Sequence, residues 1–297
     1  MTISTSSFLG DKPVRRIGFG AMQLAGPGVF GPPADPDAAR AVLRRAIELG
    51  VDHIDTAQFY GPDIVNDLIR EALHPYPETL RLVTKVGATR DADGGWVPAG
   101  APERLREQVE ANLRALGIER LDLVNLRRYE IDFPGSDEVP LADQLGVLAD
   151  LREAGKIDLI GVSNVGLDSV RTAIETVGIG EVQNPFSILD RSDAPTLELC
   201  REHQVSYVPY FPLGSAFTGG PAALAADPQV SRVAAKHGVS ATQVALAWLL
   251  AQYDRLLLIP GTSSVAHLEE NLAVADIALD GDDLAALDTV TPRPVAH

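Results

Sequence analysis

The chain has 297 residues, of which 45% are hydrophobic and 22% charged. A chain of this length can bury about three quarters of the surface that its unfolded form exposes. Its 41 aspartates and glutamates outnumber 25 lysines and arginines, and the formal charge is −16. Most of such a surface repels a phosphate backbone or an anionic membrane, so we expect neither nucleic acid nor membrane as a partner.

The single cysteine, Cys200, excludes an internal disulfide framework and a thiolate metal cluster. Residues 1–16 contain no apolar run of signal-peptide length. The longest apolar stretch, 244–251, is far shorter than the ~20 residues that cross a bilayer. We therefore expect a cytoplasmic protein without a metal site, and the sequence does not indicate its oligomeric state.

Short β-rich segments alternate with longer amphipathic segments along the chain. Asp35 and Pro36 are typical of a helix N-cap and first turn, and Gly50 is placed to end that helix. Apolar residues at 39, 42, 43, 46 and 47 recur between them at helical spacing. Residues 52–56 then have the composition of a strand, so the repeating unit is a strand followed by a helix.

The same alternation continues through the chain. Strands are expected at 17–20, 52–56, 81–86, 122–126, 159–164, 181–185, 207–213 and 256–261. Further helices are expected at 62–73, 103–116, 141–154, 167–177, 194–203, 228–251 and 265–274. Parallel strands need helical crossovers, and eight such units close a sheet into a ring. The sequence thus predicts an α/β fold, a (β/α)8 TIM barrel, rather than an open doubly wound sheet, and a single domain over 1–297.

Four stretches without periodicity each follow a predicted strand: 25–34, 87–102, 128–140 and 214–227. In a barrel, the loops after the strands form the active-site face. These stretches are therefore expected to wall a substrate pocket.

Polar residues gather at the ends of the predicted strands. They are Asp55, Tyr60, Lys85, Arg127, Ser163, Asn164, Gln183, Asn184 and Tyr210. Each has an ordinary alternative when taken alone: Asp55 could cap a helix, Tyr60 could be a packed aromatic, and Lys85 could be a solvated strand end. Because strand ends converge in a barrel, the set together predicts a site.

A buried ammonium beside a phenol favours the phenolate and lowers the pKa of the phenol, while a nearby carboxylate keeps the ammonium protonated. A phenol tuned in this way is a general acid. Carbonyl reduction needs one, because hydride that arrives at carbon leaves a developing alkoxide on oxygen.

Several segments resemble motifs of the aldo-keto reductase family. Residues 52–61 (DHIDTAQFYG) resemble its first signature, 82–86 (LVTKV) its lysine strand and 161–164 (GVSN) its fifth-strand motif. Residues 210–214 (YFPLG) are similar to its nicotinamide-stacking segment. Residues 259–261 (IPG) and 267–271 (HLEEN) together resemble the adenosine-binding segment of the family.

The resemblance implies a (β/α)8 fold, a nicotinamide cofactor bound without a Rossmann domain, and reduction of an aldehyde or ketone. It implies that Tyr60 is the proton donor, that Lys85 lowers its pKa, and that Asp55 pairs with that lysine. Ser163, Asn164 and Gln183 would hold the carboxamide, and Tyr210 would stack on the nicotinamide. The full implied cofactor set is Gly20, Ala21, Met22, Asp55, Ser163, Asn164, Gln183, Tyr210, Phe211, Pro212, Leu213, Gly214, Ser215, Ile259, Pro260, Gly261, Thr262, Ser263, Ser264, His267, Glu270 and Asn271.

One departure concerns the fourth catalytic residue, which is normally histidine in this family and here is Arg127. A guanidinium stays charged and cannot transfer a proton, but it can donate to a carbonyl oxygen and favours anionic or strongly polar substrates. The sequence around it is similar to that of a bacterial subgroup of pyridoxal reductases. The alternative is that Arg127 turns away into a salt bridge.

A second departure concerns the choice of cofactor. A lysine or arginine after the IPG segment often holds the 2′-phosphate of NADPH in this family, whereas 262–266 carry no charge. Ser263, Ser264, the helix that they begin and His267 remain candidates for that role. We expect NADPH, with NADH not excluded.

Three functional hypotheses follow. The first is an NADP(H)-dependent reductase of a small polar or aromatic aldehyde, such as a pyridoxal-like one. The second is a nicotinamide-binding sensor or regulatory subunit with weak catalysis, motivated by the missing histidine. The third uses Lys85 as a Schiff-base amine in aldol or isomerase chemistry, but it leaves Asp55, Tyr60 and the adenosine segment without a role.

Overall fold

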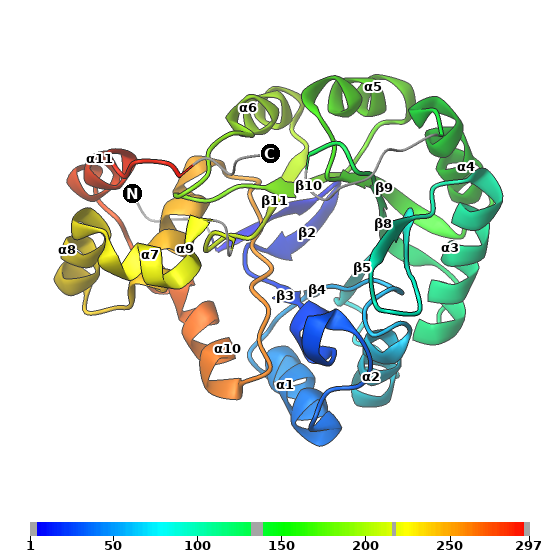
Figure 1. The fold of residues 1–297 in the computed structure, drawn as a ribbon, viewed down its shortest axis with the longest axis horizontal. Helices are drawn as coiled ribbons and strands as arrows, with labels where there is room; N and C mark the ends of the chain where they lie inside the picture. The colour runs from blue at the N-terminus through cyan, green and yellow to red at the C-terminus, as the bar shows by residue number, and fades with distance from the viewer. Residues whose placement is uncertain (1–4, 132–138, 216–217, 294–297) are drawn as a thin grey trace.

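The computed structural model describes residues 5–131, 139–215 and 218–293. Among these residues, seven parallel strands form one curled sheet with helices around its outside (Figure 1). In spatial order the strands are β11 (Ser206–Tyr210), β10 (Glu181–Pro185), β9 (Ile157–Ser163), β8 (Leu121–Arg127), β5 (Arg81–Val86), β4 (His53–Asp55) and β3 (Phe19–Gly20).

The ring between β11 and β3 is closed by residues 255–258. Leu257 N–H donates to Tyr207 O at 2.9 Å, Leu258 N–H donates to Arg16 O at 2.8 Å, and Gly18 N–H donates to Leu258 O at 2.8 Å. The strand predicted at 256–261 is therefore present only as two parallel bridges, with partners in β11 and just before β3. The predicted barrel is confirmed, with a shorter eighth strand.

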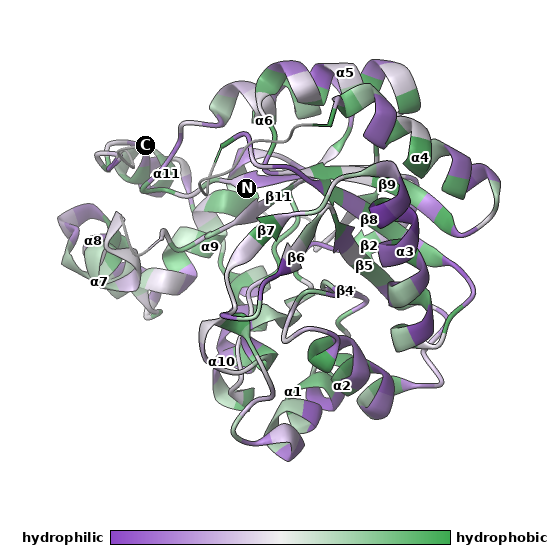
Figure 2. Ribbon diagram, turned by 45° about the vertical axis from the view of Figure 1, so that its right-hand side comes forward, coloured by the Kyte–Doolittle hydropathy of each residue, from purple (hydrophilic) through white to green (hydrophobic). Residues whose placement is uncertain are grey.

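Eleven α-helices lie within the described ranges. They are α1 (Pro36–Glu48), α2 (Ile64–Leu73), α3 (Pro102–Leu116), α4 (Leu141–Glu153), α5 (Leu167–Val177), α6 (Ala194–His203), α7 (Gly220–Ala226), α8 (Pro228–His237), α9 (Ala241–Gln252), α10 (Val265–Leu272) and α11 (Gly281–Asp288). Helix α1 begins as predicted, because the Asp35 carboxylate accepts a hydrogen bond from Ala38 N–H at 2.9 Å. Hydrophobic stripes of the outer helices face the strands (Figure 2).

The single helix predicted at 228–251 is wrong, because α8 and α9 are separate. Gly238 ends α8 with a left-handed φ of +67°, a backbone angle that residues other than glycine rarely adopt. Ser240 then begins α9 with a capping box, in which its hydroxyl accepts from Gln243 N–H. Both signals are present in the sequence, but the apolar run in α9 obscured the break.

Two of the four stretches predicted to be irregular contain regular structure. A hairpin of β6 (Ala88–Arg90) and β7 (Trp96–Pro98) occupies 87–102, and α7 lies within 214–227. The predicted loop 25–34 is irregular apart from one short 3-10 segment, Pro27–Val29. Residues 132–138 of the predicted stretch 128–140 and residues 216–217 of the stretch 214–227 fall outside the described residues.

A second hairpin, β1 (Ser6–Leu9) with β2 (Lys12–Arg15), was not predicted. Its buried Leu9 and Val14 pack on a cluster inside the barrel that includes Val83 and Leu123. These two residues precede the carboxyl ends of β5 and β8, so the hairpin closes the amino-terminal end of the ring. The opposite end is left for the site.

Arg16 lies where the ring closes, and its guanidinium is buried. It donates hydrogen bonds to the backbone oxygens of Leu250 at 2.8 Å, of Leu256 at 3.1 Å and of Tyr253. Burial lowers the pKa of Arg16 to about 10, and the Asp254 carboxylate opposes this shift. One side chain thus joins the end of α9 to the closing segment.

We predict that Arg16→Met lowers the free energy of unfolding by roughly 3 kcal/mol or more, because each buried carbonyl left without a donor costs about 1–3 kcal/mol. Urea denaturation followed by circular dichroism measures the change. Arg44→Met, on the exposed side of α1, is the control and should be nearly neutral. Equal stability of the two variants would contradict the role of Arg16 in closure.

Candidate active site

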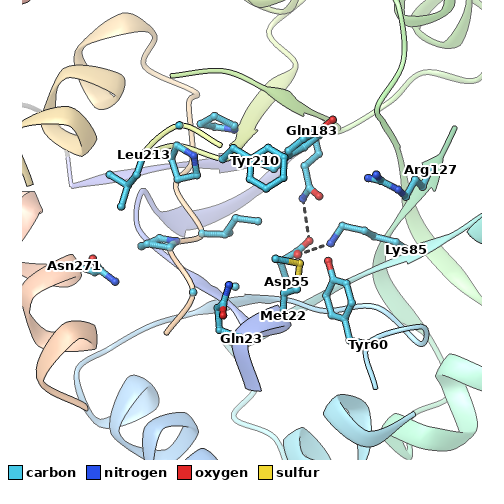
Figure 3. Close-up of a pocket in the computed structure, with 18 of the residues that line it drawn as sticks. Met22, Gln23, Asp55, Tyr60, Lys85, Arg127, Gln183, Tyr210, Leu213 and Asn271 are labelled. Atoms are coloured by element: carbon cyan, nitrogen blue, oxygen red, sulfur yellow. Dashed lines mark hydrogen bonds and ion pairs between the residues drawn. The ribbon is translucent and has the colours of Figure 1, made fainter. Parts of the chain in front are cut away.

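A cavity of about 360 Å³ opens at the carboxyl ends of the strands. Asp55 ends β4, Lys85 lies near the end of β5, and Arg127 ends β8. Together with Tyr60 from the loop after β4 and Gln183 of β10, they line this cavity (Figure 3). The structure thus brings together the side chains that the sequence placed at one rim.

The centre of the site is a buried ion pair between Lys85 and Asp55. The Lys85 ammonium donates to the Asp55 carboxylate and to Thr56 O at 3.2 Å, and the other Asp55 oxygen accepts from Gln183 Nε2 at 3.0 Å. Burial by itself lowers the pKa of Lys85, but the charge and hydrogen bonding of Asp55 together with those of Tyr60 outweigh burial, and the net pKa is raised. Lys85 is therefore held protonated, which disfavours its use as a Schiff-base amine.

Tyr60 lies against this pair, with its ring centroid 5.2 Å from Lys85 Nζ. Burial raises the pKa of the Tyr60 phenol, while the charges of Lys85 and Arg127 act to lower it. The net pKa is raised, so the expectation of a lowered value is wrong in direction, although Lys85 contributes with the expected sign. The hydroxyl keeps its proton at neutral pH.

Arg127 is 8% exposed and lies at the cavity rather than on the outside of the barrel. Its guanidinium carbon lies 5.9 Å from the ring centroid of Trp96, 5.8 Å from that of Tyr129 and 5.9 Å from that of Tyr210. Aromatic faces attract a cation without neutralising it. Arg127 therefore adds a guanidinium to the wall of the cavity.

Two glycines bring the first and eighth segments of the ring together. A Cβ atom on Gly20 would lie 2.4 Å from Ile259 O, and one on Gly261 would lie 2.6 Å from Gly20 O. Any side chain at either position would force the backbones apart. Their contact makes a wall of the cavity, next to Met22 and Pro260.

The residues expected to bind the cofactor fall into two groups. Those that line the cavity are Gly20, Met22, Asp55, Gln183, Tyr210, Phe211, Pro212, Leu213, Gly214, Ile259, Pro260, Gly261 and Asn271. Those outside its lining are Ala21, Ser163, Asn164, Ser215, Thr262, Ser263, Ser264, His267 and Glu270.

Ser163 and Asn164 nevertheless lie at the rim. Ser163 Oγ is buried and has no hydrogen-bond partner among the described residues. Asn164 donates to Arg128 O at 2.7 Å, and its side-chain oxygen accepts from the Tyr210 hydroxyl at 2.6 Å. Ser163 thus offers an unused hydroxyl that suits an amide ligand, while Asn164 orients Tyr210.

The segment after Gly261 uses two of its hydroxyls for its own backbone. Thr262 Oγ1 accepts from Ser264 N–H at 3.0 Å, and Ser264 Oγ accepts from His267 N–H at 3.5 Å at the start of α10. Ser263 is exposed beside them. Of the two serines expected to bind a phosphate, Ser263 is the one not already used as a cap.

Several cavity residues were not predicted: Gln23, Phe59, Trp96, Pro209 and Pro221. Trp96 belongs to a stretch that was expected to wall the pocket, so the segment could be predicted although the residue could not. The turn of the hairpin that carries Trp96 contains Asp93-Gly94-Gly95, a turn signal that could have located it, but each strand has only three residues.

Glu181, in β10 behind the ion pair, was also missed. It is 2% exposed, accepts a hydrogen bond from Asn125 Nδ2 at 2.7 Å and lies 3.5 Å from Gln183 Nε2. Burial, together with the Asp55 charge, raises the pKa of Glu181 to about 7. The hydrogen bond from Asn125 acts against this rise.

This raised pKa predicts a pH-dependent stability. From pH 4.5 to pH 7 the unfolded chain loses the Glu181 proton while the folded chain keeps it, so wild-type stability falls as pH rises. Glu181→Gln removes this loss, and its stability relative to wild type should rise by roughly 3 kcal/mol from about pH 4 to about pH 8.

Urea denaturation at several pH values measures this difference. Glu107→Gln, at an exposed carboxylate on α3, is the matched control and should give the same difference from wild type at every pH. A pH-independent effect of Glu181→Gln would show that Glu181 ionises normally in the folded protein.

Residues 16–292 match the model of the Aldo/keto reductase family. The chain belongs to this family. It is 47% identical over 290 residues to pyridoxine 4-dehydrogenase of Escherichia coli. This match covers 97% of this chain and 99% of the relative. It is 37% identical over 280 residues to an uncharacterized oxidoreductase of Schizosaccharomyces pombe, covering 94% and 88%.

Solved structures show the same fold. A glycerol dehydrogenase from Gluconobacter oxydans superposes with a TM-score of 0.83 at 21% identity, covering 98% of each chain. An aldo/keto reductase from Klebsiella pneumoniae in complex with NADP and acetate superposes with a TM-score of 0.78 at 24% identity, covering 98% of this chain and 96% of that one.

The predicted family, barrel and oxidoreductase class are thus confirmed. Within the described ranges, no helix combines the length and the apolar character needed to cross a membrane. The same part of the chain holds no group of three or more His, Cys, Asp or Glu side chains arranged to bind a metal ion.

Proposed function

We propose that this member of the aldo/keto reductase family reduces a small aromatic aldehyde with NADPH, and that Tyr60 is the proton donor. The observation that carries this proposal is the buried Lys85, which is paired with Asp55 and lies against the Tyr60 ring at the edge of a cavity. We also propose that residues 1–297 form one domain, since the family match spans residues 16–292. A cytoplasmic location is proposed from the sequence alone, on its single cysteine and the absence of an apolar run of signal-peptide length in residues 1–16.

The residues of the cavity fit a nicotinamide cofactor. Ser163 Oγ is buried without a partner among the described residues, which suits a carboxamide. The Gln183 amide nitrogen is used by Asp55, which leaves its oxygen for a donor such as an amide N–H. When bound, the cofactor supplies hydride to the carbonyl carbon. The Klebsiella pneumoniae relative holds NADP, which supports NADPH over NADH.

The chain supplies the proton and the charge balance of the reaction. Tyr60, kept protonated by burial, donates its proton to the carbonyl oxygen as the alkoxide develops. The Lys85 ammonium stabilises the phenolate that Tyr60 becomes, and Asp55 keeps that ammonium charged. Arg127 takes no part in proton transfer, because its guanidinium keeps its protons, but it can donate hydrogen bonds to an oxygen of the substrate.

The substrate class follows from the cavity and one relative. Phe59, Trp96 and Tyr210 line the cavity with flat rings, and Arg127 adds a positive charge beside them. A planar aldehyde with an ionised oxygen fits both features. Pyridoxal is such a molecule, and the Escherichia coli relative is a pyridoxine 4-dehydrogenase. We therefore propose a pyridoxal-like aldehyde as substrate.

We predict that Tyr60→Phe lowers kcat by about 10²- to 10⁴-fold and leaves NADPH affinity nearly unchanged, because only the proton donor is lost. Absorbance of NADPH measures turnover, and titration of NADPH fluorescence measures binding. Tyr76→Phe is the control, since the Tyr76 hydroxyl donates to Leu116 O outside the cavity. Wild-type turnover by Tyr60→Phe would overturn the proton-donor assignment.

The wild-type protein also tests the alternative of a regulatory subunit. A reductase oxidises NADPH when mixed with pyridoxal or an aromatic aldehyde in a stopped-flow instrument. A sensor binds NADPH and leaves it unoxidised with every aldehyde offered, and that result would overturn the proposed function.

We predict that Arg127→His lowers kcat/KM by about 10- to 100-fold for aldehydes with an ionised oxygen, because a hydrogen bond to a charged group contributes about 1.5–3 kcal/mol. Neutral aldehydes such as benzaldehyde should lose much less. Steady-state kinetics with both kinds of substrate measures the difference. An equal loss for charged and neutral aldehydes would show that Arg127 does not select by charge.

A further inference from the structure

Two segments on the carboxyl side of the barrel are joined next to the cavity. One is the loop 21–34 after β3, and the other is the hairpin of β6 and β7 after β5. Arg90 Nη2 of the hairpin donates to Gly28 O of the loop at 2.6 Å. The Phe30 ring packs against the hairpin turn, where a Cβ atom on Gly94 would lie 3.1 Å from it. Gly28 and Phe30 of the loop thus contact Arg90 and the turn of the hairpin.

The same arginine fixes the tryptophan that lines the cavity. The Arg90 guanidinium carbon lies 4.0 Å from the ring centroid of Trp96 and 5.7 Å from that of Phe30. The rings of Phe59 and Tyr60 meet the Trp96 ring nearly at right angles, with centroids 5.3 Å and 6.4 Å away. The Trp96 ring therefore packs between the Arg90 guanidinium and the rings of Phe59 and Tyr60.

Two nitrogen atoms of the Arg90 guanidinium are buried without a hydrogen bond to the part of the chain that the structure describes, which costs folding free energy. Its Nε and Nη1 atoms are buried and have no hydrogen-bond partner among the described residues. Unused donors of this kind cost free energy unless another contact offsets them. Stacking on an indole provides such a contact. The contact of the Arg90 guanidinium with the Trp96 ring and its hydrogen bond to Gly28 O therefore offset this cost.

Arginine is suited to this double task and lysine is not. A planar guanidinium stacks on an aromatic face while its edge still donates hydrogen bonds. A lysine ammonium can reach a carbonyl oxygen such as that of Gly28, but it offers no flat surface to Trp96. The two halves of the interaction can therefore be separated by substitution.

We propose that Arg90 is a positioning residue for the substrate. It holds Trp96 as a fixed aromatic wall beside Tyr60, so that the pocket favours flat aromatic aldehydes over flexible aliphatic ones. Arg127, whose guanidinium carbon lies 5.9 Å from the Trp96 ring, adds a charge at the same wall. This inference rests on the proposed function and adds to it the residue that sets the preference for a flat substrate.

Steady-state kinetics of Arg90→Met and Arg90→Lys tests the proposal. For Arg90→Met, KM for pyridoxal and for benzaldehyde should rise about three- to tenfold, because a partly buried cation–π contact contributes roughly 0.5–1.5 kcal/mol. KM for butanal, kcat and NADPH affinity should remain close to wild type. Arg90→Lys keeps a donor for Gly28 O and should give an intermediate KM. Arg104→Met, an exposed arginine on α3 outside the cavity lining, should behave as wild type.

Tryptophan fluorescence tests the contact without any turnover. The chain has two tryptophans, and Trp248 is 1% exposed, so quenching by acrylamide reports on Trp96. Quenching should increase in Arg90→Met, because Trp96 is released, and should stay unchanged in Arg104→Met. Unchanged quenching in Arg90→Met would overturn the inference.

The two measurements separate the inference from the proposed function. If the wild-type protein reduces aldehydes but Arg90→Met raises KM equally for benzaldehyde and butanal, or for neither, Arg90 does not select flat substrates. If the wild-type protein reduces no aldehyde, the proposed function fails, the substrate preference fails with it, and quenching alone decides whether Arg90 holds Trp96.

Discussion

The site depends on one buried positive charge and the carboxylate that compensates it. The ammonium of Lys85 is removed from water inside the barrel, which is costly unless an anion lies beside it. The sheet register pairs Asp55 with Val83, two residues before Lys85 on the same face of β5, so the lysine side chain reaches its partner on the neighbouring strand. Gln183 donates to this pair and the Tyr60 ring lies against it.

The barrel separates stability from chemistry between its two ends. At the amino-terminal end, the β1–β2 hairpin fills the ring with Leu9 and Val14, and Arg16 joins the closing segment to α9. At the carboxyl-terminal end, the polar strand ends face a cavity walled by loops. This division is the usual one for the fold, since the loops can vary while the ring stays the same. In this chain Arg127 contributes a guanidinium and Trp96 an aromatic ring to the cavity at that end.

Sequence patterns correctly predicted the helices and strands whose formation depends on a few neighbouring residues. The N-cap at Asp35 and the strand 81–86 are present as expected, because capping and strand composition act over a few residues. The helix break at Gly238 was missed despite a clear local signal. The β1–β2 hairpin was missed for another reason: its stability comes from Leu9 and Val14 packing on distant strands, which local patterns do not record.

The sequence by itself determined which chemical groups the site contains, because strand and helix spacing places Asp55, Lys85 and Gln183 at strand ends, and strand ends converge in a closed ring. The direction in which the pKa of each group shifts was decided only by the tertiary structure. The pKa of Tyr60 is raised rather than lowered, and that of Glu181 is raised to about 7, since desolvation depends on what other segments bury each group. The contact of Arg90 with Gly28 likewise joins residues 62 positions apart, a separation that no local pattern can report.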